Sequence, residues 1–590
     1  MASVPGIGIR RAESGPLRKN AAMHLFMMAL WLSTVAWFNP RLMSLGSEAH
    51  SFAGFLTLAL FIVCLNIFWM FGSYYVAVFL FSFFSQTPSV RSPPRPPSHA
   101  EVAVLYLTRN DFKYEAALSC VRLRYDRFHV FILDDSTEPD RISEVDAFHR
   151  AYPRITTVIR REGRRGFKAG SLNNALRNHA IAFPYFAVID ADGVTPPDFL
   201  AKLMPHFSTD KTIGFVQGAQ RPNPRQKSKF ASDLAPGILP LWTTYYPPRN
   251  KHGFVLFLGH GGIVRRDVWE AVGGFPEIAA EDLGFSTKAR EHGYQGLFVD
   301  DVHSLEDFPE TYRQLRGQQE RYVKGGCEFL GTGLLRSFLR SSTPAWFEKL
   351  DLVLWISTLF LPILYLVFLV VYAVLMPLSY AQPRTLEISF FGLDLGLWGV
   401  FPLSDRVQSV WGWDFFAVTV INVFAPVLGS LRQAAIHPAR TLKLLVVSCV
   451  PYLSLSVLSV IAVLTYATKR HVEWDVTGES PKAVARRTEG SRPSHGGAGI
   501  GHASPTLLAL ELGLGAVLTV TLLMTFNAAL MVYPLSLLLG PALHRFQWRA
   551  TVLTAAVATP YVLLILAMGS VGASLWGMQG ISYALFPFHL

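Results

Sequence analysis

The sequence predicts an α/β domain of the doubly wound type, cytosolic and inserted between α-helical transmembrane segments. Of the 590 residues, 51% are hydrophobic and only 16% are charged, against roughly 25% charged in a typical soluble domain. Apolar runs long enough to span a bilayer flank a more polar block, residues 100–330. Within that block, strand-like and helix-like patterns alternate, and acidic residues follow several of the strands.

The charge and cysteine content narrow the class of protein. The formal net charge is +11, and the basic residues cluster beside apolar segments. That placement favours a lipid bilayer over nucleic acid as the partner. The cysteines lie far apart without metal-site spacing, so they predict no disulfide framework and fit a reduced cytosolic or intramembrane setting. They are Cys64, Cys120, Cys327 and Cys449.

The chain begins with a basic arm, residues 1–20, which we expect to stay in the cytosol. Two transmembrane helices are predicted within residues 21–85. No small-residue cleavage site follows the first apolar run, so we interpret that run as an uncleaved membrane helix. Residues 86–99 contain RSPPRPP and predict an extended linker rich in proline and arginine.

Residues 100–330 contain the elements of the α/β domain. Short apolar runs predict strands, and the segments between them have helical patterns. In such a sheet, ligands bind at the carboxyl ends of the parallel strands. Strands are expected at 101–108, 129–133, 155–159 and 186–189, and helices at 115–123, 169–182 and 283–294.

The rest of the chain predicts further membrane segments. We expect an interfacial helix at 331–350, two transmembrane helices with an extracytoplasmic loop at 351–443, and two more transmembrane helices at 506–590. The apolar runs behind these expectations are 351–377, 412–430, 506–538 and 551–572. Six crossings in total predict a multi-pass protein of the inner (plasma) membrane.

The apolar run 444–467 is long enough to span the membrane but has basic residues on both sides. A full crossing would place one basic cluster outside, against the positive-inside rule. Pro451 also interrupts the run. We therefore interpret 444–467 as an interfacial or re-entrant helix and 468–505 as a cytosolic loop. The basic residues are Arg432, Arg440, Lys443, Lys469, Arg470, Lys482, Arg486 and Arg487.

Two carboxylates end one of the predicted strands. Asp190 and Asp192 are two residues apart, so their side chains point to the same face of the strand. Together they can bind one hard divalent cation, Mg²⁺ or Mn²⁺. Taken alone, such a pair is more often a solvated turn or a helix cap. A second acidic pair, Asp134 and Asp135, ends a neighbouring strand and favours the metal site.

Further candidate residues lie in a basic turn and before a predicted helix. The turn 164–173 places Lys168 among glycines that let a phosphate approach the backbone, although a basic surface turn is the alternative. Asp282 is a candidate base, although acidic residues at a helix start also stabilise the helix. We prefer it to His260, because lone histidines are seldom catalytic.

A third group of candidates has helical spacing. Gln318, Arg321 and Tyr322 are spaced i, i+3, i+4 and therefore share one helix face. An aromatic ring can stack on a sugar, and an arginine can contact a phosphate. The alternative is an amphipathic helix at a membrane surface.

In their order along the chain, these motifs resemble those of the processive family-two membrane glycosyltransferases, such as cellulose, curdlan, chitin and hyaluronan synthases. The resemblance implies a GT-A (Rossmann-like) fold for residues 100–330 and a gating-type loop within 468–505. Tyr322 stands where this family usually has tryptophan. The matching motifs are LTRND (107–111), DD (134–135), KAG (168–170), DAD (190–192), AED (280–282), QQERY (318–322) and WDVTGE (474–479).

The resemblance also implies a role for each matching residue. Asp282 would be the catalytic base, and Asp190 and Asp192 would hold Mg²⁺ or Mn²⁺. The nucleotide-sugar would be bound by Thr108, Asp111, Asp135, Lys168 and Asp190. The acceptor end and the pyrophosphate would contact Gln318, Arg321, Tyr322, Trp474 and Thr477.

By this resemblance, the chain is expected to be an inverting β-glycosyltransferase that polymerises a polysaccharide from a UDP-sugar and translocates it. UDP-glucose and a β-glucan are the expected donor and product. The alternative is a non-processive enzyme with a lipid acceptor, because ceramide glucosyltransferases share the Gln-x-x-Arg-aromatic pattern. A channel or transporter is less favoured, because the apolar segments contain almost no charged residues. The sequence carries no signal for or against accessory subunits.

Overall fold

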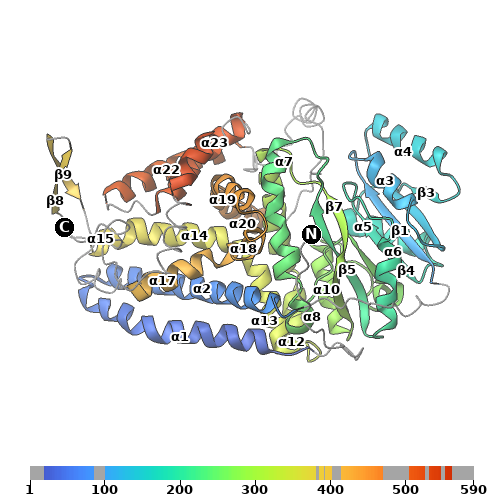
Figure 1. Cartoon of the computed structure of the whole chain (residues 1–590), viewed down its shortest axis with the longest axis horizontal. Helices are drawn as coiled ribbons and strands as arrows, with labels where there is room; N and C mark the ends of the chain where they lie inside the picture. The colour runs from blue at the N-terminus through green and yellow to red at the C-terminus, as the bar shows by residue number, and fades with distance from the viewer. Residues whose placement is uncertain are drawn as a thin grey trace, which may run out of the picture.

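The computed structural model contains an α/β domain with a bundle of long apolar helices beside it (Figure 1). The sheet lies at one end of the molecule, and the helices α1 (Ala22–Ser44) and α2 (Phe52–Ser82) run away from it. The structure describes residues 19–85, 100–380, 384–390, 393–400, 413–469, 504–524, 530–546, 552–560 and 562.

The α/β domain is built on a mixed seven-stranded sheet in the order β3-β2-β1-β4-β6-β5-β7. The strands β3, β2, β1 and β4 are parallel, and β6 is antiparallel to both of its neighbours. β5 and β7 pair in parallel. The strands are β1 (Val102–Thr108), β2 (Phe128–Asp134), β3 (Thr156–Ile159), β4 (Tyr185–Ile189), β5 (Ile213–Pro222), β6 (Gly262–Arg265) and β7 (Gln295–Glu306).

Helices cover both faces of this sheet, so its central strands are buried on both sides. Val102, Val104 and Tyr106 of β1 pack with α3 and α4, whereas Ala103 and Leu105 pack with α5 and α10. This alternation is the period-two pattern of a strand. The helices of the domain are α3 (Tyr114–Val121), α4 (Pro139–Ala151), α5 (Phe167–Asn178), α6 (Phe199–Leu203), α7 (Lys229–Leu234), α8 (Arg249–His252), α9 (Arg266–Ala271), α10 (Glu281–Glu291), α11 (Tyr312–Gly331) and α12 (Leu334–Arg340).

The fold class predicted from the sequence is confirmed. The strands expected at 129–133 and 155–159 correspond to β2 and β3, within one residue at each end. The second half of the sheet, β5 to β7, was not predicted. In β7 the charged residues Asp300 and Asp301 interrupt the apolar pattern, and pairing with β5 stabilises the strand nevertheless.

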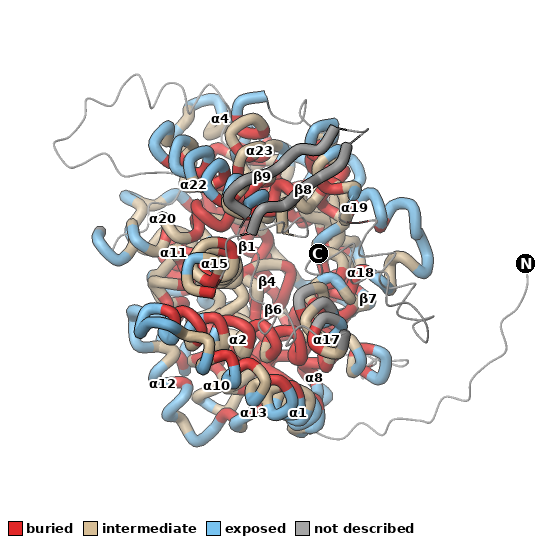
Figure 2. The backbone as a smooth tube through the Cα atoms, turned by 90° about the vertical axis from the view of Figure 1, so that its left-hand side faces the viewer, coloured by how far each residue is buried: buried red, intermediate tan, exposed pale blue. Residues whose placement is uncertain are grey.

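Among the described residues, five helical runs are long and apolar enough to cross a membrane, judged by length and composition. They are consistent with a membrane protein. Large apolar residues of α1 and α22 are exposed, as lipid contact requires. Figure 2 colours parts of both helices as exposed on the outside of the bundle. The five runs are Ala22–Glu48, Phe52–Ser82, Trp346–Tyr380, Pro438–Thr468 and Pro505–Met524.

The observed helices differ from the expected spans in three places. The run 412–430 contains α17 (Trp413–Phe424) and the start of α18 (Gly429–Ala434), separated by a 3₁₀ turn. The run 506–538 is divided between α22 (Pro505–Met524) and α23 (Val532–Phe546), which pack against each other. An unexpected hairpin, β8 (Arg384–Phe390) with β9 (Leu393–Val400), lies at the end of the molecule opposite the sheet (Figure 1).

The run 444–467 lies within α19 (Pro438–Leu453) and α20 (Leu455–Lys469), which are interrupted at Ser454. Together they are long enough to cross a membrane, and the interfacial or re-entrant interpretation stays a prediction. The loop that follows, with Trp474 and Thr477, lies outside the described residues. Residues 331–350 contain α12 and the start of α13 (Trp346–Ser357), which continues through α14 (Leu361–Val370) to α15 (Met376–Tyr380).

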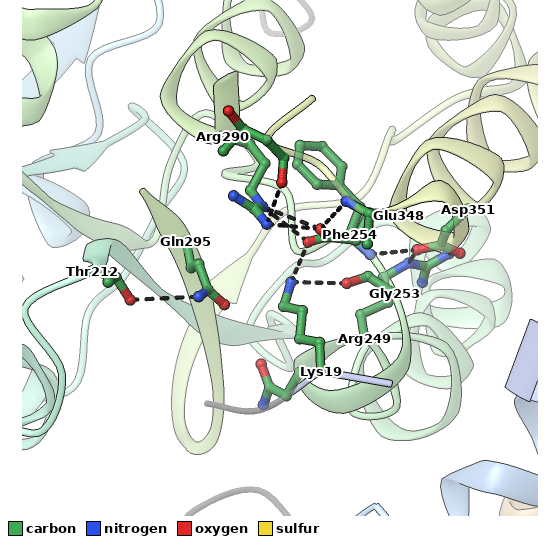
Figure 3. A network of polar contacts seen from close by, with 12 residues as sticks. Lys19, Thr212, Arg249, Gly253, Phe254, Arg290, Gln295, Glu348 and Asp351 are labelled. Atoms are coloured by element: carbon green, nitrogen blue, oxygen red, sulfur yellow. Dashed lines mark hydrogen bonds and ion pairs between the residues drawn. The ribbon is translucent and has the colours of Figure 1, made fainter. Parts of the chain in front are cut away.

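Buried ion pairs join the α/β domain to the helix bundle (Figure 3). Lys19, just before α1, lies 2.9 Å from Glu348 of α13 and donates a hydrogen bond to the carbonyl oxygen of Gly253. Arg290 at the end of α10 contacts the same Glu348 carboxylate at 2.9 Å. Lys19, Glu348 and Arg290 therefore form a polar junction between the domain and the bundle.

A second pair lies in the same junction. Arg249 of α8 and Asp351 of α13 are both almost fully buried, with 3.0 Å between Nε and Oδ2. Asp351 also accepts hydrogen bonds from the backbone N–H of Phe254 and from the Tyr74 hydroxyl of α2. Each carboxylate of this junction thus has a cationic partner and further hydrogen-bond donors.

Candidate active site

The two aspartates predicted to bind a metal lie at the carboxyl end of β4, beside the end of β1. Lys168 of α5 places its Nζ 2.6 Å from Asp190 Oδ1 and 3.8 Å from Glu281 Oε1. The Tyr106 hydroxyl donates to the carbonyl oxygen of Ala191, which fixes the turn after β4. The structure therefore brings Lys168, Asp190 and the start of α10 together.

The two aspartates have opposite pKa shifts. Burial works against ionisation of Asp190, yet the neighbouring Lys168 and His260 hold the pKa of its carboxyl below the ordinary value. Burial and the negative charge of Asp190 raise the pKa of Asp192 to about 7. Asp192 therefore lacks a full counter-charge.

The donor set of this site fits a hard divalent cation, which prefers carboxylate oxygens and would supply the missing positive charge. Among the described residues, no group of three or more His, Cys, Asp or Glu side chains could hold a metal ion by itself. Asp190 and Asp192 would therefore share the cation with oxygens from a substrate and water. Gly193, the next residue, offers no further ligand.

The end of β1 forms a tight polar turn. The Thr108 hydroxyl and the backbone N–H of Arg109 both donate to Asp111 Oδ1, at 3.0 and 2.6 Å. Asn110 has a positive φ of 58°, and its Oδ1 accepts the backbone N–H of Thr137. Asn110 thereby ties the β1 turn to the β2 turn. The only signal in the sequence for this role is the residue type, because asparagine adopts the left-handed conformation more readily than most residues.

The acidic pair at the end of β2 is held by two arginines that the sequence analysis missed. Asp134 contacts Arg160 Nε at 2.7 Å, and Asp135 makes a bidentate contact with Arg161 at 2.9 and 2.7 Å. Both arginines follow β3, which pairs with β2. The backbone N–H of Asp135 donates to the carbonyl oxygen of Thr108, so the two predicted nucleotide-binding residues are neighbours.

Asp282 lies in the first turn of α10, where its Oδ1 accepts the backbone N–H of Leu283 at 2.7 Å. Burial raises the pKa of Asp282, and burial, reinforced by the charge of Asp282, raises the pKa of Glu281 to about 8. Gly259 has a positive φ of 79°, and a Cβ there would lie 3.4 Å from both Asp282 Oδ2 and Lys168 Nζ. Glycine therefore keeps side-chain atoms away from these two groups.

A third acidic position, Glu306 at the end of β7, was not predicted. Its Oε1 lies 3.6 Å from His260 Nε2, and Gln220 Nε2 lies 3.0 Å from the His260 ring. Burial and the charge of Asp192 raise the pKa of Glu306 well above the ordinary value. The only sequence signal was the pair Glu306-Asp307, and without β7 it could not be placed near Asp192.

The helix α11 brings its predicted face to this acidic edge. Partial burial and the Glu306 carboxylate raise the pKa of the Tyr322 phenol, and Asp282 adds to this shift. Tyr322 nevertheless remains 53% exposed, so its ring can meet a ligand. Gln318 and Arg321 lie on the same helix within about one turn of Tyr322.

Together these elements form a site with more carboxyl groups than cations. It could bind an anionic ligand through a metal ion and nearby cations such as Lys168 and Arg321, and it offers buried carboxylates that could accept a proton. Of the predicted residues, Lys168, Asp190, Asp192, Asp282 and Tyr322 are close enough to influence one another's charge. Thr108, Asp111 and Asp135 border it at the ends of β1 and β2.

Comparison with known proteins adds a family relationship. The model of "Glycosyl transferase family group 2" matches residues 185–431, from β4 to α18. The matched segment contains Asp190, Asp192, Asp282 and the whole of α11, but not β1 to β3.

Curated relatives share about a quarter of their aligned residues with this chain. "Probable glucomannan 4-beta-mannosyltransferase 11" of Arabidopsis thaliana is 28% identical over 229 residues, 38% of this chain and 52% of the relative. "Probable glucomannan 4-beta-mannosyltransferase 4" of Oryza sativa subsp. japonica is 26% identical over 296 residues, 48% of this chain and 51% of the relative. The chain thus spans about half the length of the curated relatives it matches.

Among solved structures, the chain is similar to the mannosyltransferase PcManGT from Pyrobaculum calidifontis in complex with GDP-Man and Mn²⁺. The TM-score is 0.41 and the sequence identity 18%, over 64% of this chain and 98% of that chain.

Proposed function

We propose that this chain, which belongs to the family-2 glycosyltransferases, is a membrane β-glycosyltransferase that builds a polysaccharide from a nucleotide-sugar. The observation that carries this proposal is the cluster of Lys168, Asp190 and Asp282 at the carboxyl end of β4. Few cations beside many carboxylates suit a metal-bound diphosphate with a base nearby. The relatives named as 4-beta-mannosyltransferases support a β-linked product.

The donor would lie along the ends of β1, β2 and β4. Thr108, Asp111 and Asp135 would contact the nucleotide, and Lys168 would contact the diphosphate. Asp190 and Asp192 would hold Mg²⁺ or Mn²⁺. When bound, the cation would neutralise the charge that develops on the departing diphosphate.

The transfer step follows from the position of Asp282. An acceptor hydroxyl attacks the anomeric carbon, and the carbon–oxygen bond to the diphosphate breaks with its electron pair leaving on the diphosphate. Asp282 takes the hydroxyl proton, and its raised pKa makes it a better base than an exposed aspartate. Attack from the side opposite the leaving group inverts the anomeric configuration. Tyr322 would stack on the acceptor sugar, and Gln318 and Arg321 would contact the acceptor end and the diphosphate.

Two nucleotide-sugars are candidates for the donor. UDP-glucose is the donor implied by the resemblance to cellulose and curdlan synthases. A mannose nucleotide such as GDP-mannose is the alternative, because the curated relatives are named as mannosyltransferases. The residues of the site recognise the diphosphate and a sugar in general, and are compatible with both donors.

The membrane helices would determine the side of the membrane on which the product is made and the path by which it leaves. We expect the α/β domain on the cytosolic side of the inner membrane and a product that leaves through the helix bundle. The loop with Trp474 and Thr477 would close over the donor. The candidate spans on both sides of the α/β domain support a membrane location.

The test uses membranes that contain the protein. A panel of radiolabelled UDP- and GDP-sugars is supplied with Mg²⁺ or Mn²⁺, and the product is digested with linkage-specific hydrolases. Insoluble or size-heterogeneous glycan from one donor supports the proposal, whereas one discrete glycolipid supports the lipid-acceptor alternative. The Asp282→Asn variant is the matched control. Equal product from this control would contradict the assignment of the site.

A further inference from the structure

One charged side chain lies inside a candidate membrane helix and faces the α/β domain. Glu511 of α22 is fully buried, and its Oε1 lies 2.8 Å from Arg316 of α11, which is also fully buried. Burying two charges is unfavourable unless they pair well, and removal of one partner leaves an uncompensated buried charge. An ionisable residue in a membrane segment is therefore a functional candidate.

The pair is part of a cluster in which four segments meet. The Tyr312 hydroxyl of α11 bonds the Ser454 hydroxyl at 2.6 Å, at the interruption between α19 and α20. A Cβ on Gly540 of α23 would lie 3.5 Å from the Tyr312 hydroxyl and 3.6 Å from Glu511 Oε2. Glycine thus lets α23 approach closely at the point where α11, α22 and the α19–α20 interruption converge.

Other contacts extend this attachment along α11. Arg313 Nε lies 3.3 Å from His544 Nε2 of α23, and Gln319 donates to the Ser459 hydroxyl of α20 at 3.3 Å. α11 is therefore bonded to three membrane-side helices on one side while its Tyr322 approaches the acidic edge on another. Arg316 and Tyr322 are six residues apart, which is about 9 Å along a helix.

We propose that the Arg316–Glu511 pair is a positioning device that fixes α11, and with it Gln318, Arg321 and Tyr322, against the membrane helices. This role rests on the transfer reaction proposed above, since it concerns the acceptor side of that site. The ion pair joins α11 to α22 at one defined point, and Arg316 Nη1 also donates to the Tyr312 hydroxyl at 3.4 Å, so the pair sets the register of α11 in a way that apolar packing does not. The residues proposed to contact the nucleotide, Thr108, Asp111 and Asp135, lie at the ends of β1 and β2 and not on α11.

The experiment compares three variants of the full chain in detergent: Glu511→Gln, the double variant Arg316→Met with Glu511→Leu, and the control Asp351→Asn. Asp351 belongs to a similarly buried ion pair that joins the domain to the bundle through α8 and α13. The readouts are the midpoint of thermal unfolding, the Kd of UDP and GDP with Mn²⁺, and the length distribution of radiolabelled product from UDP-glucose or GDP-mannose.

We expect Glu511→Gln to change the Kd of the nucleotide by no more than about twofold and to shorten the product. The rate of transfer should fall by ~10–100-fold, because a displacement of about 1 Å at the site can cost 10²-fold in rate. The double variant should recover the unfolding midpoint, since apolar residues often replace a buried pair well, but not the product length. Asp351→Asn should lower the midpoint of thermal unfolding. Its product should not be shorter than any loss of transfer rate explains.

Two outcomes would overturn the positioning role. One is recovery of both stability and product length in the double variant, which would make the pair purely structural. The other is the same shortening in Asp351→Asn, which would make it a general effect of loosening the domain from the bundle. Failure of the proposed function is distinguishable, because then the unsubstituted protein would bind no nucleotide and transfer no sugar.

Discussion

The junction between the domain and the helix bundle and the acidic edge of the sheet are both buried and rich in carboxylates, but they differ in how the charge is balanced. At the junction, Glu348 has Lys19 and Arg290, and Asp351 has Arg249 and further donors. At the acidic edge, the pKa values of Asp192 and Glu281 are raised to about 7 and about 8.

This difference separates structural charges from ligand-binding charges. A buried carboxylate with complete partners stabilises the native state and has no capacity left for a ligand. A buried carboxylate whose pKa is raised lacks positive charge, and a cation or a proton supplies it. The comparison therefore predicts that substitutions at the acidic edge reduce activity, whereas substitutions at the junction reduce stability.

The largest effect is expected at the metal-binding pair. Asp192→Asn should abolish transfer, because the diphosphate would lose its cation and with it the stabilisation of developing charge. The protein should remain folded, since the raised pKa of Asp192 means that its charged form is unfavourable without a cation, whereas asparagine is neutral. Product formation and Mn²⁺ binding measure the effect. Full activity of the unsubstituted protein in excess EDTA would contradict the metal assignment.

The next effect concerns the base. Asp282→Asn should reduce turnover by ~10²–10⁴-fold while leaving UDP or GDP affinity nearly unchanged, because a base acts only in the chemical step. Steady-state rates at saturating donor, together with nucleotide titrations, distinguish the two quantities. Weak nucleotide binding with normal turnover at saturation would make Asp282 a binding residue.

A substitution at the junction should show the opposite pattern. Asp351→Asn leaves the buried Arg249 without its charge partner, so it should lower the free energy of unfolding by about 3–5 kcal/mol. Nucleotide affinity at low temperature should be unchanged. Thermal unfolding with and without UDP measures both. An unaltered midpoint with lost nucleotide binding would remove the distinction between the two regions.

The smallest effect should appear in the pH dependence of the metal-free protein. Glu281 has a pKa of about 8 in the folded state against an ordinary value of 4.5, so the folded protein keeps a proton that the unfolded chain releases. The stability that this proton contributes is complete below about pH 4.5 and is lost as the pH rises to about 8. Unfolding midpoints in EDTA should therefore fall across this range, and less so in Glu281→Gln. Identical slopes for the two proteins would contradict the raised pKa.

The sequence predicted the first half of the sheet well, because its strands are buried on both faces and appear as uninterrupted apolar runs. The run before Asp190 is an example, and the position of the two aspartates at its end followed directly. β7 was missed because Asp300 and Asp301 break its apolar pattern, and β5 supplies the stabilising partner. Glu306 was missed along with it.

Within the site, residues on one strand or one helix were predictable and contacts between elements were not. The common face of Gln318, Arg321 and Tyr322 follows from helical spacing alone. Arg160 and Arg161 reach Asp134 and Asp135 only because β3 pairs with β2. The partner of Glu511 depends on how α22 packs against α11, which no local pattern encodes.

The attachment of Lys19 sets an order of events during biosynthesis. Its two partners, Gly253 and Glu348, are 234 and 329 residues further along the chain. At 5–20 residues per second, the ribosome needs roughly 20–70 s to produce the second partner. Until Gly253 has been made, α1 can insert into the bilayer while Lys19 has neither contact. A segment made well before its partners is thus among the last to reach its final place, and a chain halted before Glu348 would leave this lysine available to other carboxylates.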